Sequence, residues 1–242
     1  MNTQIFKSVR VFAPSDFRLI WRDGALMASM LFIMPLAGWA MRYVLPWLAD
    51  LLSEWIALDA YYGLVVAGMF IAGQPVLIGF LIGVLFVEER DQGTLDVLRA
   101  SPFSLPAFLL YRFAIGITLS LVLTIITVLL VGLISVSWPE LLASAMLAAL
   151  FVPVVVLVYA VFIKNKVQAL MFVKPLQTWG GLPAFLVFAP MPVQWIGGLL
   201  MPMYFPIRFF WGASQGQPEW WLLIPGVVIP LSLLAWLWKR IN

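Results

Sequence analysis

Long apolar stretches alternate with short polar segments along this chain of 242 residues. A stretch of ~20 apolar residues is long enough to cross the hydrocarbon core of a bilayer as an α-helix. Six such stretches are predicted, at about residues 24–40 (with an extension to 47 as the alternative), 63–87, 107–136, 141–163, 176–200 and 221–238. The pattern therefore predicts an all-α integral membrane protein with six transmembrane helices in a single transmembrane domain, residues 1–242.

The first 23 residues differ from the apolar stretches because charged and apolar positions are interleaved. Lys7, Arg10, Arg18 and Arg22 are distributed among large apolar side chains, which leaves no continuous apolar core for a cleavable signal peptide. This mixture is typical of a helix that lies in the membrane interface with its basic face toward anionic head groups. We therefore expect an amphipathic interfacial helix over residues 1–23.

The fifth apolar stretch is interrupted by Pro183, Pro190 and Pro192. A proline inside a helix removes a backbone hydrogen bond and clashes with the preceding turn, so a straight helix is not expected there. Residues 201–220 remain aromatic and proline-rich, too irregular for a span and too apolar for an exposed loop. We predict a broken outer element over residues 190–220, just before the last helix.

The basic residues predict the orientation in the membrane. Of the 14 lysines and arginines, only Arg42 and Arg208 fall on one predicted side. The others lie in residues 1–23, 88–112 and 163–174 and at the C-terminus. Because cytoplasmic loops carry an excess of Lys and Arg, both termini and residues 88–104 are predicted to be cytoplasmic.

Composition excludes most enzyme classes. The chain is 64% hydrophobic and 10% charged, against roughly 45–50% and about 25% in soluble domains. It has no His and no Cys, which removes thiolate and Ser-His-Asp catalysis, disulfides, and the usual zinc and copper ligands. No metal site is expected, and basic residues scattered over short loops make no stripe for nucleic acid.

Residues 88–102, directly after the second apolar stretch, read EERDQGTLDVLRASP. This segment resembles the permease subunits of type-2 ABC exporters. In that family, the second span is followed by an acidic pair, a Gly-Thr-Leu-acidic core, a leucine, and a small residue before a proline. The residues of this chain that carry the resemblance are Glu88, Glu89, Gly93, Thr94, Leu95, Asp96, Leu98 and Pro102.

The same segment has a physical interpretation of its own. Leu95 and Leu98 lie three residues apart and share one face of a helix, surrounded by charges. This makes a small apolar surface with a charged rim that could fit a cleft in another protein. The alternative is an ordinary solvated helix on the membrane surface. Our hypothesis is that the segment transmits the movement of an ATPase to the spans.

The resemblance implies a complete architecture. Residues 1–23 would be a connecting helix, residues 88–104 a cytoplasmic coupling helix docked on the ATPase, and residues 190–220 short re-entrant outer helices. The permease would work with a second, identical or homologous permease and two cytoplasmic ABC ATPase subunits, in the inner membrane of a bacterium or archaeon. No P-loop sequence occurs in the chain, so ATP and Mg²⁺ would be bound by the ATPase, and the chain itself needs no cofactor.

The cargo is less constrained by the sequence. No Asp, Glu or Lys falls within the predicted spans, which argues against a proton-coupled antiporter and favours export of a hydrophobic or amphipathic cargo. A drug-like molecule is preferred because the chain resembles the half-size drug-export permeases of this family in its size and its uncharged path. Lipid, lipid-linked glycan and hydrophobic peptide are the alternatives. A non-transporting membrane assembly or immunity protein, which belongs to another functional class, remains an alternative. An enzyme that acts on lipid would need ionisable residues that converge at one membrane depth.

Polar and small residues inside the predicted spans are candidates for contact with the cargo or with other helices. Gln74 precedes Pro75, and a proline inside a helix leaves a backbone carbonyl of the preceding turn without a hydrogen-bond donor. The alternative to a cargo contact is that the Gln74 amide satisfies the backbone locally. The candidates for the cargo path are Gln74, Thr124, Gln177 and Thr178. The candidates for close packing of helices or of two permeases are Gly68, Ala72, Gly79 and Gly83, small residues four apart in two pairs.

Overall fold

The computed structural model describes residues 24–93 and 105–241, and every regular element in these two ranges is helical. Five helical segments are long and apolar enough to cross a membrane: Leu31–Leu52, Leu58–Asp91, Pro106–Val131, Trp138–Phe162 and Trp220–Arg240. The prediction of an all-helical protein with several membrane-spanning segments is confirmed. The predicted interfacial helix, residues 1–23, lies outside the described residues.

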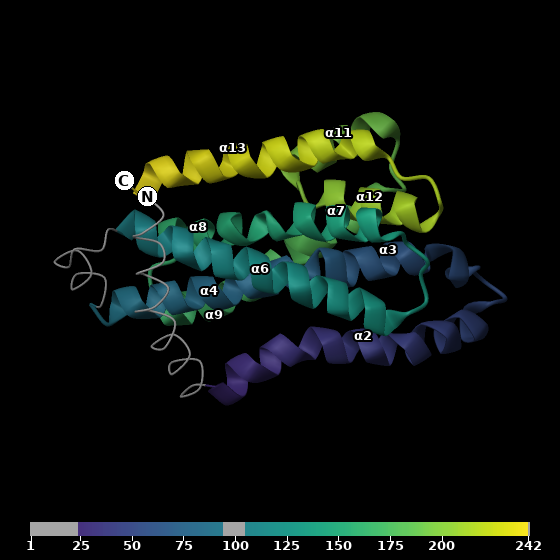
Figure 1. Cartoon of the computed structure of the whole chain (residues 1–242), viewed down its shortest axis with the longest axis horizontal. Helices are drawn as coiled ribbons and strands as arrows, with labels where there is room; N and C mark the ends of the chain where they lie inside the picture. The colour runs from purple at the N-terminus through teal and green to yellow at the C-terminus, as the bar shows by residue number, and fades with distance from the viewer. Residues whose placement is uncertain (1–23, 94–104, 242) are drawn as a thin grey trace.

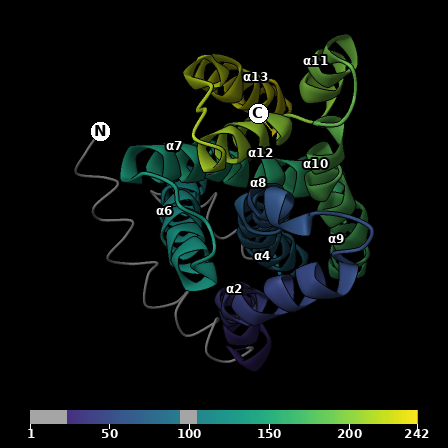
Figure 2. The same ribbon diagram turned by 90° about the vertical axis from the view of Figure 1, so that its right-hand side faces the viewer.

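The long helices run side by side and form one bundle (Figure 1). Viewed along the bundle in Figure 2, α4 (Gly73–Asp91) and α8 (Phe151–Phe162) lie centrally, with α6 (Leu105–Val131) on one side and α9 (Lys166–Gly181) on the other. We define the motif end of the bundle as the end at which α4 terminates. There α2 (Gly24–Leu52) begins and α13 (Leu223–Ile241) ends, at the left of Figure 1.

The second span is a composite of four consecutive helical elements. It consists of η1 (Leu58–Tyr61), α3 (Tyr62–Val66), the π-helical turn η2 (Ala67–Ile71) and α4. In the π turn, the backbone N–H of Ala72 donates to the carbonyl of Ala67, five residues earlier, at 3.0 Å. Single π turns of this kind widen a helix locally and are frequent at functional sites.

The second span is also longer than predicted at both ends. We expected residues 63–87, followed by a separate coupling helix from residue 88, but α4 continues to Asp91. Residues 88–91, whose charged side chains have partners on neighbouring helices, thus belong to α4. The coupling helix over residues 88–104 stays a prediction, since residues 94–104 lie outside the described residues. Similarly, α2 continues to Leu52, beyond the predicted end of the first span.

The boundary between the third and fourth spans is shifted. The third span was expected to continue to residue 136, but α6 ends at Val131 because Gly132 has a φ of +61°, a conformation that ends helices and favours glycine. α7 (Trp138–Ala149) then begins before the predicted residue 141. Ser137 and Glu140 form a capping box at its start, in which the Ser137 backbone N–H donates to Oε2 of Glu140 at 2.9 Å.

The predicted fifth span is not one membrane-length helix. Residues 166–200 form three short helices, α9, α10 (Pro183–Leu186) and α11 (Met191–Leu200). Pro183 and Pro192 lie in the first turns of α10 and α11, where the missing N–H costs nothing. Six spans are thus not confirmed, since five segments within the described ranges have the required length and hydropathy.

The lysines of residues 163–174, which the sequence assigns to a basic cytoplasmic segment between two spans, do not all lie in a loop. The side chain of Asn165 accepts a hydrogen bond from the backbone N–H of Gln168 at 2.8 Å and starts α9 at Lys166. Lys174 consequently lies inside a helix, two turns beyond its start.

Residues 201–220, expected to be irregular, contain a well-packed helix. α12 (Tyr204–Ser214) is one of the most deeply buried elements, and Phe205, Phe209 and Phe210 in it have no exposed surface. It packs against α7 and η2 at the end of the bundle opposite the motif end. Arg208 of α12 forms an ion pair with Glu219, with Nη2 and Oε1 2.6 Å apart, which holds the loop that leads through η3 (Trp220–Leu222) to α13.

Candidate functional site

The last turn of α4, residues 88–91, is charged at every position, and each side chain contacts another helix. We call this region the junction. It comprises residues 88–91, Arg112 of α6, the carbonyl groups of Ala160 and Ile163 at the end of α8, and Lys166 of α9.

Glu89 and Arg112 form a buried ion pair between α4 and α6. Nη2 of Arg112 donates to Oε1 of Glu89 at 2.5 Å, and the two side chains are 5% (Arg112) and 12% (Glu89) exposed. The guanidinium carbon of Arg112 also lies 4.4 Å from the centroid of the Phe108 ring. Since an isolated charge at such a position is costly to bury, each residue of the pair stabilises the other.

Arg90 connects α4 to the end of α8. Its Nη1 donates to the carbonyl oxygen of Ala160 at 3.1 Å, and its Nη2 donates to that of Ile163. Carbonyl groups in the last turn of a helix have no partner within the helix, and a cation at this end also interacts favourably with the helix dipole. Arg90, which lies on a neighbouring helix, therefore supplies hydrogen-bond donors to carbonyl groups at the end of α8.

Lys166 makes the corresponding contact at the start of α9. Its Nζ lies 2.9 Å from Oε1 of Glu88, and its backbone N–H donates to Oδ2 of Asp91 at 3.1 Å. Carboxylates at the start of a helix are favourable because the N–H groups of the first turn are exposed there. The last turn of α4 is thus bound to α6, α8 and α9 at once.

Gly93 ends the helix that carries the junction. It has a φ of +73°, which favours glycine, and its N–H donates to the carbonyl of Arg90 at 3.1 Å. The other residues that carry the family motif, Thr94, Leu95, Asp96, Leu98 and Pro102, lie outside the described residues. The junction is the described structure that immediately precedes them.

Two adjoining cavities lie beside the π turn of the second span. The larger has a volume of about 750 Å³ and the smaller about 260 Å³, and Gly68, Met69 and Gly181 line both. The larger cavity lies toward the end opposite the motif end, since Ile56 and Leu58 contribute to it. Ligand pockets commonly measure ~300–1,000 Å³, so the larger cavity is wide enough for a drug-sized molecule.

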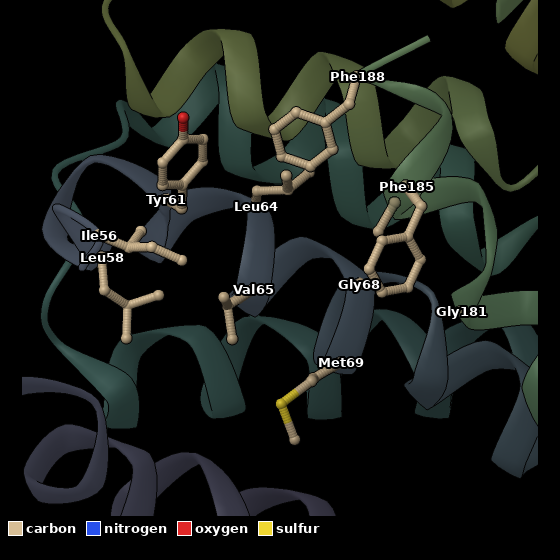
Figure 3. A pocket seen from close by; sticks show the side chains of 11 residues that line it. Ile56, Leu58, Tyr61, Leu64, Val65, Gly68, Met69, Gly181, Phe185 and Phe188 are labelled. Carbon is tan, nitrogen blue, oxygen red and sulfur yellow. The ribbon is translucent and has the colours of Figure 1, made fainter. Parts of the chain in front are cut away.

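The larger cavity is lined by apolar and aromatic side chains. Figure 3 shows the rings of Tyr61, Phe185 and Phe188 facing it, with Val65 and Met69 on the side of the π turn. The Tyr61 and Phe188 rings contact each other with their centroids 5.7 Å apart. A surface of rings and a flexible thioether can adapt to planar apolar molecules of differing shape.

The four residues predicted for a cargo path occupy different environments. Gln177 lines the smaller cavity, and Thr178 is exposed and donates to the backbone carbonyl of Lys174 at 3.0 Å. Gln74 and Thr124 are fully buried, and neither the Gln74 amide nor the Thr124 hydroxyl has a hydrogen-bond partner within the described ranges. Of these four residues, Gln177 is the one that lines either of the two cavities described above.

The four small residues predicted for packing divide into two pairs. Gly79 and Gly83 allow α4 to approach α8 within this chain, since a Cβ atom would lie 2.6 Å from the Val155 Cβ at the first and 2.6 Å from the Tyr159 Cγ at the second. Gly68 and Ala72 instead line the smaller cavity. The first pair therefore contributes to packing inside the subunit.

Several functional candidates were missed from the sequence. Arg90 and Lys166 complete the junction, and Tyr61, Phe185 and Phe188 line the larger cavity. The charge next to Glu89 could have suggested a role for Arg90, but nothing local links Lys166 to a carboxylate 78 positions earlier. The aromatic rings are ordinary in a membrane sequence until the fold brings them together.

Comparisons with known proteins place these features in context. A family model described as fluoroquinolones export permease protein Rv2686c-like matches residues 16–238. The fluoroquinolones export permease proteins Rv2686c and MT2760, from the H37Rv and CDC 1551 strains of Mycobacterium tuberculosis, are each 28% identical over 243 residues, which covers 97% of this chain and 94% of the relative. No solved structure matches significantly. The matched range includes both the junction and the two cavities.

Proposed function

The chain belongs to the Rv2686c-like family of fluoroquinolones export permeases, and on this premise we propose that it is the membrane subunit of an ATP-driven exporter. In the proposed complex, two cytoplasmic ABC ATPase subunits bind and hydrolyse ATP with Mg²⁺, and a second permease, identical or homologous, completes the path. The absence of a P-loop sequence supports placing hydrolysis in a partner. The complex lies in the inner membrane, with the motif end and both termini in the cytoplasm.

The junction is the observation that carries this proposal. Residues 94–104 follow the last turn of α4 in the chain, and that turn is bound to α6, α8 and α9 through buried or charge-assisted contacts. Charge-assisted hydrogen bonds are short and directional, so these helices would move together with α4. The proposed role of Glu88 and Glu89 is thus to connect the coupling segment to other spans, while Leu95 and Leu98 supply the contact with the ATPase.

We propose a hydrophobic or amphipathic drug-like cargo. The two relatives are named for the export of fluoroquinolones, and an apolar, ring-lined cavity of about 750 Å³ in this chain supports a cargo of that size. Lipid, lipid-linked glycan and hydrophobic peptide are the other cargoes to be tested.

The proposal is tested by purifying the permease in nanodiscs together with its candidate ATPase. Leu95→Asp places a charge in the apolar surface of the coupling segment and should weaken the complex. Gln217→Ala, an exposed side chain at the other end of the bundle, is the matched control. We expect the wild type and the control to bind the ATPase and alter its ATP hydrolysis, and Leu95→Asp to lose both effects. If the wild type binds no ATPase, a non-transporting membrane protein becomes the better account.

A further inference from the structure

Gln194 is a buried polar side chain on a helix that is otherwise largely exposed. Of the ten residues of α11, Gln194 and Gly198 are the two that are buried, and the helix lies at the margin of the bundle in Figure 2. A buried amide needs hydrogen-bond partners. The partners of Gln194 therefore show what this side chain holds in place.

The amide nitrogen of Gln194 donates to the turn that joins α10 to α11. Nε2 lies 3.1 Å from the carbonyl oxygen of Val187 and 2.7 Å from that of Ala189. An amide nitrogen carries two hydrogens, so these two bonds use both of them. The two carbonyl groups flank Phe188 in the chain, and the amide thus fixes the backbone on both sides of this residue.

The oxygen of the same amide joins the turn to α12. Oε1 of Gln194 accepts a hydrogen bond from the hydroxyl of Tyr204 at 2.5 Å. Tyr204 is the first residue of α12, the buried helix that packs against α7 and η2. A Cβ atom on Gly198, one turn after Gln194, would lie 2.8 Å from Cδ1 of Tyr204, so α11 approaches this ring closely. The amide is therefore anchored on a well-packed helix.

Phe188, the residue that these bonds flank, faces the larger cavity. Its ring lines that cavity and contacts the ring of Tyr61, with the two centroids 5.7 Å apart (Figure 3). Tyr61 belongs to η1, so this contact joins the turn to the second span. The Phe188 side chain is 60% exposed, and its position therefore depends on the backbone that Gln194 holds.

We propose that Gln194 is a positioning residue for cargo recognition, which acts by holding Phe188 at the wall of the larger cavity. Tyr204 anchors the amide, the amide fixes the turn, and the turn directs the Phe188 ring toward Tyr61. Gln194 itself does not line the cavity. This inference rests on the proposed export function and adds a residue outside the cavity that sets its shape.

The first test measures the position of Phe188 without any cargo. The chain contains no cysteine, so Tyr61→Cys and Phe188→Cys together introduce its only two thiols. Their rate of crosslinking by a short bifunctional thiosulfonate reagent is measured in nanodiscs. Gln194→Met is then added, which keeps a similar volume and removes all three side-chain hydrogen bonds, or Tyr204→Phe, which removes the hydroxyl alone. Gln217→Met, an exposed glutamine in the loop after α12, is the matched control.

We expect Gln194→Met to slow the crosslinking about fivefold, the size of one lost neutral hydrogen bond. Tyr204→Phe should slow it less, because the amide keeps both bonds to the turn, and Gln217→Met should leave the rate unchanged. Tyr204→Phe differs from the wild type by a single oxygen atom, so it tests the inference even if Gln194→Met does not fold.

The second test measures whether cargo recognition depends on that position. Ciprofloxacin, a fluoroquinolone, is the probe, and its stimulation of ATP hydrolysis is titrated in nanodiscs that contain the permease and its ATPase. We expect Gln194→Met to raise the half-maximal concentration about fivefold and to change the maximal rate less than about twofold. Phe188→Ala should raise the half-maximal concentration at least as much. The double variant should match Phe188→Ala alone, because Gln194 acts through Phe188.

Three outcomes overturn the inference while leaving the export function intact. Unchanged crosslinking in both Gln194→Met and Tyr204→Phe would mean that other contacts hold the turn, such as those of the Trp195 ring. Slower crosslinking with an unchanged half-maximal concentration would mean that Phe188 does not meet the cargo. A lower maximal rate alone, or additive effects of Gln194→Met and Phe188→Ala, would mean a general structural role.

Failure of the proposed cargo gives a different result. A wild type that ciprofloxacin does not stimulate overturns the proposed drug-like cargo and, with it, the role of Gln194 in recognition. The crosslinking rates still decide whether Gln194 holds Phe188 in place.

Discussion

Oε1 of Glu89 and Nη2 of Arg112 lie 2.5 Å apart, and this buried pair joins α4 to α6 across 23 positions of the chain. Glu89 stands one turn before Gly93, the glycine that follows the end of α4 at Asp91. Arg112 stands in the second turn of the next described helix. Residues 94–104 therefore connect two helices that are already bound to each other at their near ends, and a force on this segment acts on both.

A double-mutant cycle on this pair should show strong coupling. Glu89→Gln and Arg112→Met each leave a buried partner without its counter-charge, which costs about 3–5 kcal/mol. The double variant should be less destabilised than the sum of the two. The free energy of unfolding in mixed detergent micelles is the measurement.

Lys166→Met is the control, because the Lys166 side chain in its pair with Glu88 is 46% exposed and the pair should contribute at most about 1 kcal/mol. Additive single effects would show that the pair does not couple.

Gly79→Ala should weaken the contact between α4 and α8. The new Cβ would lie 2.6 Å from the Val155 Cβ, and overpacking of this kind costs about 1–3 kcal/mol. Gly181→Ala is the matched control, since no atom lies within 4 Å of its Cβ position. The thermal midpoint of the detergent-solubilised protein distinguishes the two. A change in oligomeric state with unchanged stability would instead assign Gly79 to an interface between permeases.

Gly93→Ala should separate a backbone effect from a functional one. Gly93 and Gly216 have the same φ of +73° and open space around a Cβ atom, so alanine should cost about 1–2 kcal/mol at either position. Only Gly93 adjoins the coupling segment. We expect both variants to lose similar stability and only Gly93→Ala to alter stimulation of ATP hydrolysis by cargo. The same hydrolysis response in both would contradict a special role for the turn at Gly93.

Gln74→Leu should keep or raise stability. Both polar atoms of the Gln74 side chain are buried without a partner within the described ranges, and burying such an amide costs about 1–3 kcal/mol. Leucine has a similar volume and no polar group to satisfy. Unfolding in detergent provides the readout, with Ala148→Leu as a control that adds volume at a fully buried position of the core. A loss of stability in Gln74→Leu as large as in Ala148→Leu would mean that the amide has a partner in the native protein.

The long spans were predictable because their signal is local. Continuous apolar runs identify the segments around α4, α6 and α13, and the charges at residues 88–91 mark the end of the second span. The errors arose where local chemistry competes with hydropathy. Gly132 ends α6 while the sequence is still apolar, and Asn165 starts α9 within a segment whose lysines suggest a loop.

The junction and the cavities were only partly predictable. The motif singled out Glu88 and Glu89 but not their partners, because Arg112 and Lys166 become neighbours only after the helices pack. The π turn at Ala67–Ile71 leaves no recognisable signature in the sequence. Lys174 was counted among the basic residues of a cytoplasmic segment, and only the structure shows that it lies inside α9.

The most direct test of the account measures cargo exported per ATP hydrolysed in the reconstituted complex. Glu89→Gln breaks the ion pair at the junction, and Glu219→Gln breaks an arginine–glutamate pair of similar geometry, with Nη2 and Oε1 2.6 Å apart, at the opposite end. We predict that Glu89→Gln retains ATP hydrolysis but exports about tenfold less cargo per ATP, a coupling loss of about 1.4 kcal/mol. Glu219→Gln should keep the wild-type ratio. An unchanged ratio in Glu89→Gln would contradict the proposal that the junction transmits the movement of the ATPase to the spans.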